Sequence, residues 1–291
     1  MTTDGQQMEI KHKKKKLPLT SLIGIIGLGV LVLGLVISLV WQKRPRNVQE
    51  AEILFAGTMN DADCTILISG KHCVIIDTGE VDDGEHIAEL LESRDVEQID
   101  YLVLTHPDKD HIGGADEILN RFSVKHVITP YYGQYSATYS ALISRIEQDK
   151  IERSILREVT ELSCGDFSLL FYPPEKKFYN DDNEYSLVTL VTHGNVKLLL
   201  AADIEKERIS ELGSVSFSGV DLLKVPYHGR SSNAAADFIR RISPRIAIVN
   251  AAAPESKIQK TLSKLGVEVY CTNGADWDFF SDGNTLRLNE A

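Results

Sequence analysis

Hydrophobic and polar positions divide this chain into one N-terminal apolar stretch and a long region of short alternating segments. Leu19 to Val40 is 22 residues without a charge, and at the rise of a helix that length crosses the hydrocarbon core of a bilayer. Its glycines would weaken a soluble helix but are common in membrane helices, and Trp41 stands where an interfacial aromatic would anchor the end. We therefore predict a transmembrane helix over 19–41, with the lipid bilayer as its partner.

Basic residues on either side of this stretch predict its orientation. Five lysines precede it, whereas three basic residues follow it. The excess predicts a cytoplasmic basic tail (1–18), a linker (42–50) and a large domain (51–291) outside the cell, in a single-pass protein of the cell membrane. A cleavable signal peptide is the alternative, but the apolar stretch is long for one and no small-residue cleavage site precedes a clear mature start.

From residue 51 onward, short apolar runs alternate with amphipathic segments, separated by glycines. The runs predict strands over 52–56, 65–69, 74–77, 101–104, 126–129, 167–172, 186–192, 197–201, 222–225, 246–250 and 267–271. The amphipathic segments predict helices over 85–93, 115–122, 139–155, 205–212, 234–242 and 255–265. Two strand-rich halves with helices between their strands indicate packed sheets covered by helices, an α/β (α+β) fold.

The large domain is strongly acidic. The whole chain has a formal charge of −11, and residues 47–291 carry 23 basic against 40 acidic side chains. They lack the broad basic surface that gives non-specific affinity for nucleic acid. Divalent cations bound at a site would reverse the field there, so the charge disfavours a nucleic-acid substrate but does not exclude one.

The four cysteines give no zinc-ribbon spacing, because no CxxC occurs. A short turn near Gly70 would pair Cys73 with about residue 68, so we expect no bridge from Cys73 to Cys64. Buried free thiols are the expected state for most of them, and the sequence leaves the pairing of Cys164 with Cys271 open.

Four other histidines and a group of tyrosines are not expected to take part in catalysis. Solvated or structural roles are expected for His72, His86, His126 and His193. Four tyrosines follow the strand predicted over 126–129: Tyr131, Tyr132, Tyr135 and Tyr139. We expect them to pack in the core and loops; the alternative is that they line a groove for stacking on bases or sugars.

The segment from Thr105 to Gly114, with the sequence THPDKDHIGG, holds four potential metal ligands. It directly follows the apolar run 101–104, which indicates a buried strand, and precedes a helical segment. The ligands therefore stand on a turn, where a loop lets neighbouring side chains converge: His106, Asp108, Asp110 and His111. Imidazole and carboxylate suit Zn²⁺, and a carboxylate-rich set shifts the preference toward harder ions such as Mn²⁺.

This motif and several other segments resemble the metallo-β-lactamase superfamily, and within it the extracellular metallohydrolase domain of ComEC/Rec2 competence proteins. The further matching pieces occur in order as VIIDTG (74–79), NEYSLV (183–188), LLLAADIE (198–205), LKVPYHG (223–229), CTNG (271–274) and SDG (281–283). The resemblance spans about residues 51–291. It implies a four-layer αββα sandwich.

The same resemblance implies a centre of two divalent ions, Zn²⁺ or Mn²⁺. By analogy, one ion faces His106 and Asp108, the second faces Asp110, His111 and His228, and Asp203 bridges the two. Two such ions can share a water and lower its pKa toward neutrality. Asp110 would orient that water and accept its proton as the catalytic residue, and Asp77 would support the centre through hydrogen bonds.

Three departures from the superfamily pattern bear on this assignment. Asp108 stands where most members have histidine, a change that the competence branch shares and that implies a shift in metal preference. The separate third-motif histidine is missing, and Asn183 and Ser186 reproduce the branch's Asn and Ser there, with a role near substrate or metal. Tyr227 replaces the first of two histidines usual in that branch, which would weaken one metal site if that histidine is a ligand.

The sequence leaves three functions open. The leading hypothesis is a membrane-anchored, outward-facing, metal-dependent hydrolase, with phosphodiester bonds of nucleic acid as the first substrate. The second is hydrolysis of a small ester, lactone, amide or phosphoester, which the acidic domain favours. The third is a non-catalytic surface binding domain on a degenerate scaffold, which Tyr227 and the missing histidine favour. One membrane segment is too few for a channel, so a role in DNA uptake is not expected, and protein partners are unknown.

Overall fold

A computed structural model describes residues 48–289 of the chain. The expected tail 1–18, the transmembrane helix over 19–41 and most of the expected linker therefore lie outside the described residues. Within residues 48–289, no helix is both long enough and apolar enough to span a bilayer.

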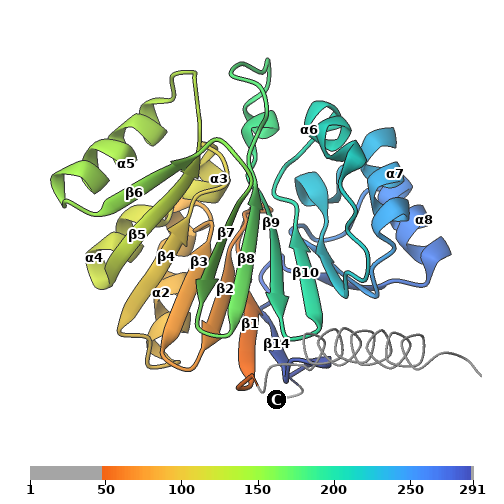
Figure 1. Cartoon of the computed structure of the whole chain (residues 1–291), viewed down its shortest axis with the longest axis horizontal. Helices are drawn as coiled ribbons and strands as arrows, with labels where there is room; N and C mark the ends of the chain where they lie inside the picture. The colour runs from red at the N-terminus through yellow and green to blue at the C-terminus, as the bar shows by residue number, and fades with distance from the viewer. Residues whose placement is uncertain (1–47, 290–291) are drawn as a thin grey trace, which may run out of the picture. The chain divides into compact units, whose positions relative to one another are not determined.

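Two mixed β-sheets form the centre of the described domain (Figure 1). The first has the order β15-β14-β1-β2-β3-β4-β5-β6, built from β1 (Ala51–Phe55), β2 (Thr65–Ser69), β3 (His72–Ile76), β4 (Gln98–Val103), β5 (Ser123–Pro130), β6 (Glu152–Leu156), β14 (Trp277–Ser281) and β15 (Leu286–Leu288). The second has the order β13-β12-β11-β10-β9-β8-β7, built from β7 (Thr160–Cys164), β8 (Phe167–Tyr172), β9 (Val188–His193), β10 (Val196–Leu200), β11 (Leu222–Lys224), β12 (Ile246–Val249) and β13 (Glu268–Cys271).

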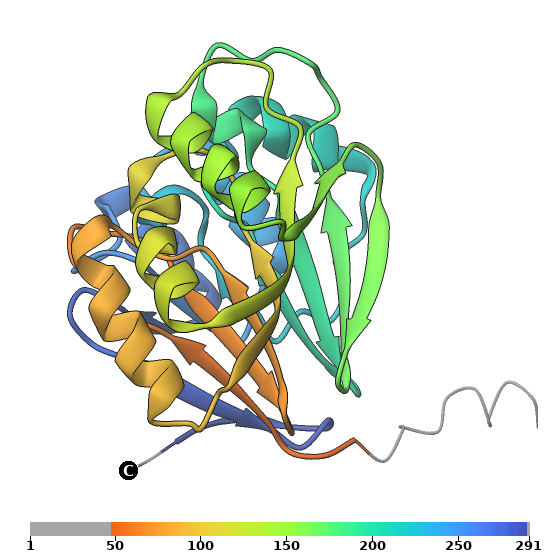
Figure 2. The same cartoon turned by 90° about the vertical axis from the view of Figure 1, so that its left-hand side faces the viewer.

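Helices cover the outer face of each sheet (Figures 1 and 2). The first sheet carries α2 (Gly84–Glu92), α4 (Ala115–Arg121) and α5 (Ala137–Gln148), whose apolar side chains share a core with the outer face of that sheet. The second carries α6 (Lys206–Glu211), α7 (Asn233–Ile242) and α8 (Ser256–Leu265). A third core lies between the sheets. The expected four-layer αββα sandwich is confirmed.

The apolar runs of the sequence follow from this layering. Successive residues of a strand face opposite sides of the sheet, and both sides are buried here. In β1, Ile53 and Phe55 point into the core between the sheets, whereas Leu54 contacts the helix-side core. A strand buried on both faces is apolar almost throughout, and such continuous apolar runs predict strands from sequence.

One expected helix is wrong over its last seven residues, 149–155. The helix predicted over 139–155 ends at Gln148, and Glu152–Leu156 is strand β6, which pairs in parallel with β5. Lys150 has a φ of 56°, a left-handed conformation that stops a helix. Strands β7, β14 and β15 were not anticipated either.

The cysteine expectations for the hairpin are confirmed. Cys73 pairs with Ile68 across the β2–β3 hairpin, so Cys64 is not opposite it. All four cysteines are free thiols; Cys64, Cys73 and Cys164 are buried and Cys271 is half-buried.

Parallel strands bring distant segments to one edge of the sandwich. Strands β3 and β4 are parallel in the first sheet, and β10 and β11 are parallel in the second. The loops that leave the carboxyl ends of these four strands begin with Asp77, Leu104, Ala201 and Val225. Ligand sites of α/β proteins typically lie at such strand ends, and the candidate site lies here.

Candidate metal centre

The THPDKDHIGG segment forms a tight loop and one short helix after β4. Helix α3 (Lys109–Ile112) begins after Asp108, which has an extended backbone. A Cβ atom on Gly114 would lie 2.2 Å from the Thr78 carbonyl oxygen, so only glycine permits this approach to the loop after β3. The Thr78 amide donates to the His111 carbonyl over 2.7 Å, which ties the two loops together.

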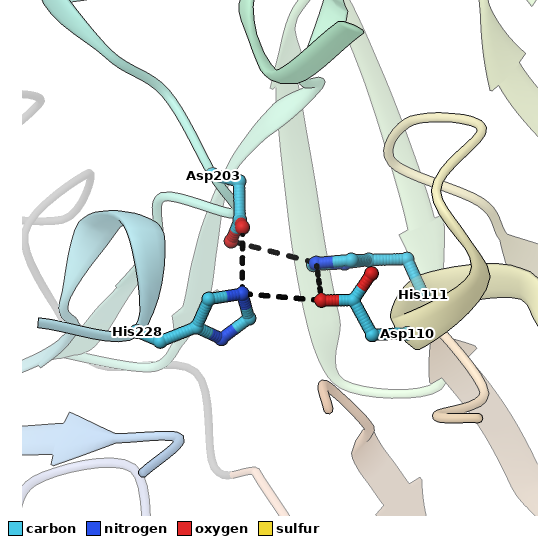
Figure 3. Close-up of side chains that lie close together, drawn as sticks. All are labelled: Asp110, His111, Asp203 and His228. Carbon is cyan, nitrogen blue, oxygen red and sulfur yellow. Dashed lines mark ion pairs between the residues drawn. The ribbon is translucent and has the colours of Figure 1, made fainter. Parts of the chain in front are cut away.

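Four side chains from three separate loops converge at this edge (Figure 3). They are Asp110 and His111 of α3, Asp203 after β10 and His228 after β11, and one ligand atom from each lies within 4.8 Å of the others. Asp203 is central to the group. Its two carboxylate oxygens lie 3.4 Å from His111 Nε2 and 2.7 Å from His228 Nε2.

Asp110 completes this group from the side of α3. Its Oδ2 lies 3.3 Å from His228 Nε2 and 3.8 Å from His111 Nε2. The Asp110 side chain is 28% exposed, whereas those of the other three are almost fully buried. Asp110 is therefore the member of the group that solvent or a substrate can reach.

His106 and Asp108 lie beside the four-residue group. The ring of His106 is 4.0 Å from that of His111, centroid to centroid. His106 Nε2 lies 3.6 Å from Asp108 Oδ2, and the Asp108 side chain is 39% exposed. The six residues expected as metal ligands thus occupy one continuous region, in which Asp108 and Asp110 are the partly exposed members.

Asp77 holds the loop that carries the histidines. Its Oδ1 accepts from the Thr105 amide over 2.8 Å, and its Oδ2 accepts from the Thr105 hydroxyl over 2.6 Å. Asp77 Oδ2 also lies 2.7 Å from His111 Nδ1. A hydrogen bond at Nδ1 leaves the other ring nitrogen of His111, Nε2, available to bind a metal ion. This Nε2 atom faces Asp203.

Of the two residues predicted from segment 183–186, Ser186 contacts the expected metal ligands directly and Asn183 does not. The Ser186 hydroxyl lies 3.4 Å from His106 Nδ1 and accepts from the Asp203 amide over 3.2 Å. Asn183 is buried, but its side-chain amide donates to Glu205. Ser186 therefore fixes two expected ligands, whereas Asn183 acts on the loop next to them.

Tyr227 shares the unusual turn that presents His228. Both residues have left-handed backbones, with φ of 48° and 50°. The Arg230 guanidinium lies 4.8 Å from the centre of the Tyr227 ring, and its Nη1 donates to the Tyr227 hydroxyl over 3.4 Å. The ring of Tyr227 is 6.0 Å from that of His228, so Tyr227 lies next to the four-residue group without belonging to it.

Two residues of the centre were missed from the sequence, Asp63 and Lys224. Lys224 Nζ is hydrogen-bonded to Asp63 Oδ2 and lies 3.3 Å from Asp203 Oδ1, and only 3% of Lys224 is exposed. Asp63 Oδ1 lies 3.5 Å from His228 Nδ1. A lysine within the apolar segment 222–225 was a usable signal, because lysine is almost never fully buried unless it is paired.

Charges within the centre shift the pKa values of its members in the metal-free protein. Burial would lower the pKa of His228, but Asp203 and Asp110 outweigh it and raise that pKa to about 11. Burial would raise the pKa of Asp110, but His228 and His111 lower it to about 2. The pKa of Asp203 lies well below its ordinary value because Lys224 and His111 outweigh the effect of burial. The carboxylates of Asp110 and Asp203 are thus ionised at neutral pH, and the His228 imidazole beside them is protonated.

The composition of the centre fits bound cations. Four of its buried atoms make no well-formed hydrogen bond within the described part of the chain, three of them imidazole nitrogens: Asp63 Oδ1, His106 Nε2, His111 Nε2 and His228 Nδ1. A buried polar atom without a partner destabilises the folded state, and a bound metal ion can serve as the partner of an imidazole nitrogen. A buried His/Asp cluster with free ligand atoms is consistent with a metal site.

Comparison with known families agrees with this geometry. The family model described as "Metallo-beta-lactamase superfamily" matches residues 57–250, which include every residue of the centre. The chain belongs to the metallo-β-lactamase superfamily. Its buried His/Asp cluster is typical of the superfamily's metal-dependent hydrolases.

Curated relatives of this superfamily member are competence proteins. ComE operon protein 3 of Bacillus subtilis (strain 168) is 28% identical over 200 residues, covering 63% of this chain and 24% of that protein. Competence protein ComA of Neisseria gonorrhoeae is 26% identical over 248 residues, covering 79% of this chain and 32% of that protein. The chain therefore spans only about a quarter to a third of the length of these relatives.

Solved structures show the same fold at low identity. The metallo-β-lactamase fold protein YhfI of Bacillus subtilis has a TM-score of 0.53 and 12% identity, covering 79% of this chain and 99% of YhfI. A diphosphatase from the PhnP family has a TM-score of 0.50 and 13% identity, covering 80% of this chain and 98% of that one. At this identity the likeness extends to the fold alone.

Proposed function

We propose that this chain is a metal-dependent hydrolase that cleaves phosphodiester bonds. The observation that carries the proposal is the convergence of Asp110, His111, Asp203 and His228 at one strand-end edge, in a superfamily that contains metal-dependent hydrolases. In this proposal His106 and Asp108 hold one divalent ion, Zn²⁺ or Mn²⁺. Asp110, His111 and His228 hold a second ion, and Asp203 serves both. Such ions acidify water and stabilise developing negative charge.

The protein's own groups have separate roles in this scheme. Asp110 is the catalytic residue, because it is ionised at neutral pH and more exposed than His111, Asp203 and His228. It would orient the attacking water and accept its proton. Asp77 and Ser186 are positioning residues that fix His111 and His106 through their Nδ1 atoms.

Aromatic and basic side chains near the centre favour a phosphodiester of nucleic acid as the substrate. A hollow of about 320 Å³ is lined by Tyr131, Tyr132, Arg153 and Arg157, among others. Arg157 stacks on Tyr131 at 3.8 Å. The Tyr132 hydroxyl donates to Asp182, whose pKa is raised first by burial and then by the charge of Asp108. Stacking surfaces next to guanidinium groups suit single-stranded nucleic acid.

The acidic surface favours the second candidate, hydrolysis of a small ester, lactone or phosphoester. Residues 47–291 carry 17 more acidic than basic side chains. Such a surface repels a long polyanion at low ionic strength, whereas a small substrate is affected much less. The two candidates therefore differ in substrate size and share the same centre.

A substrate panel with full-length protein tests both candidates. The panel compares Mn²⁺-stimulated cleavage of single- and double-stranded DNA with turnover of a small phosphodiester, a phosphomonoester and a lactone. Asp110→Ala should abolish activity, and Asp116→Ala, an exposed aspartate of α4, should retain it. Intact DNA with turnover of a small substrate would select the second candidate. A chain that binds no metal and turns over nothing would favour the non-catalytic binding domain.

We also propose that residues 19–41 anchor this domain to the outer face of the cell membrane. The support is the uncharged stretch of the sequence and the lysines before it. Protease added to intact cells should remove the domain from the cell surface. Full protection, with cleavage only after lysis, would reverse this topology.

A further inference from the structure

A second group of ligand-type side chains lies at the opposite end of the strands from the metal centre. It consists of His72 at the start of β3, Asp100 in β4 and Cys164 at the end of β7, and we call it the β3–β7 cluster. Asp77, which supports the metal centre, follows the other end of β3. Asp77 follows His72 by five residue steps of extended strand, roughly 16 Å, so the two groups are separate sites.

Asp100 is the hub of the β3–β7 cluster. Its Oδ2 lies 3.1 Å from His72 Nδ1 and 3.6 Å from Cys164 Sγ. The same oxygen accepts from the Cys73 amide, and the other oxygen, Oδ1, accepts from Lys125 Nζ over 2.5 Å. Lys125 and the Cys73 amide thus fix the carboxylate with Oδ2 turned toward the imidazole and the thiol.

These distances match the edges of a tetrahedral zinc site. Bonds of about 2.0 Å to nitrogen or oxygen and about 2.3 Å to sulfur place N and O ligands about 3.3 Å apart, and S and O ligands about 3.6 Å apart. The observed separations are 3.1 and 3.6 Å, and the third, between His72 and Cys164, is within 4.8 Å. Because about half of the His72 side chain is exposed, it can close this last edge without disturbing the core.

The order of the three side chains does not suit nucleophilic catalysis. A cysteine nucleophile needs the imidazole between the thiol and the carboxylate, whereas here the carboxylate stands between the other two. A site of one thiolate, one imidazole and one carboxylate is instead a zinc ligand set, in which the metal neutralises both anions. A hollow of about 270 Å³, lined by these three residues with Lys125, His126 and Glu152 among others, leaves room for a fourth ligand.

We infer that the β3–β7 cluster is a zinc site separate from the catalytic centre, with His72, Asp100 and Cys164 as protein ligands and water as the fourth. His72 and Asp100 belong to the first sheet and Cys164 to the second. A bound ion therefore links the two sheets at the end of the sandwich away from the centre. This inference does not rest on the proposed hydrolase function.

Cobalt absorption separates this site from the catalytic centre, because the residues of that centre include no cysteine. Full-length protein in mild detergent and reductant is titrated with Co²⁺ alone. We expect a near-ultraviolet thiolate-to-cobalt charge-transfer band that is lost in Cys164→Ser and retained in Cys73→Ser. Absence of the band from the wild type, or its persistence in Cys164→Ser, would overturn the inference.

A surface histidine provides a second variant that leaves the core intact. His72→Gln should weaken the Co²⁺ affinity measured from this band by roughly tenfold or more. The matched control is His86→Gln, because His86 is similarly exposed and pairs with Asp276 as His72 pairs with Asp100. Equal affinities of His72→Gln and the wild type would also overturn the assignment.

Discussion

Lys224 Nζ lies 3.3 Å from Asp203 Oδ1, so the carboxylate at the middle of the metal centre has a permanent cation of the protein beside it. The same ammonium group is hydrogen-bonded to Asp63. Because the Asp203 carboxylate touches a buried lysine, one of its oxygens stays partly neutralised whether or not the proposed metal ion is bound. The arrangement allows Asp203 to stay buried and ionised when the centre holds no metal.

Removing this cation should destabilise the metal-free protein strongly. In Lys224→Met, Asp63 and Asp203 stay buried without their partner, and breaking a buried ion pair costs about 3–5 kcal/mol. Added Zn²⁺ should restore part of the loss, since the metal supplies the missing positive charge. Urea unfolding with chelator and with Zn²⁺ measures both effects.

The control for this variant is a lysine in an exposed ion pair. Lys176→Met removes the contact with Glu207, where about half of each side chain is exposed, and should leave the unfolding midpoint unchanged. Equal stability of Lys224→Met and the wild type in chelator would contradict the role given to Lys224.

The hydrogen bonds of Asp77 should set the metal affinity of the centre. Asp77→Asn keeps the size of the side chain but exchanges one of the acceptor oxygens for a donor, so it cannot serve Thr105 and His111 together. We expect the affinity for Zn²⁺ to fall about 10- to 100-fold, measured by competition with a chromophoric chelator. Asp276→Asn is the control, because Asp276 supports the surface residue His86. A similar loss in both variants would show that the effect is not specific.

The parts of the site that the sequence predicted are those carried by one continuous segment. His106, Asp108, Asp110 and His111 follow one apolar strand, and their convergence depends only on a local turn. Asp203 and His228 were found because the resemblance supplied them. Their approach to Asp110 is decided by parallel strand pairing in the second sheet, which periodicity alone does not reveal.

The missed features depend on contacts between remote segments. Asp63 reaches the centre from the loop after β1, where its amide binds the Asp110 carbonyl. Strand β14 pairs with β1 from more than 200 residues away. Residues 152–155 fall within the helix predicted over 139–155, but they pair with the edge of β5 as part of strand β6. In each case tertiary pairing outweighs the local preference.

The metal-free protein should lose stability as the pH rises above neutrality. The pKa of His228 is 6.5 in its ordinary state and about 11 in the fold. A raised folded pKa contributes stability that is complete below about 6.5 and is lost as the pH rises toward 11. Thermal melts in chelator across this range should show a decline that is shallower in His228→Gln. Identical slopes for the two proteins would contradict the strong pairing of His228 with Asp203.

The substitution at Tyr227 should leave the metal content of the centre intact. Tyr227 contacts Arg230 through both its ring and its hydroxyl, whereas the converging ligand atoms come from other residues. We therefore expect Tyr227→Phe and Tyr227→His to bind as many Zn²⁺ ions per chain as the wild type, as measured by mass spectrometry of the metal. The activity of Tyr227→Phe on a small phosphodiester should stay within a fewfold of wild type, because the hydroxyl has no partner in the centre among the described contacts. If Tyr227→His instead gained one ion per chain, the wild-type centre would be short of a ligand, and the two-ion scheme would have to give way to a single occupied position.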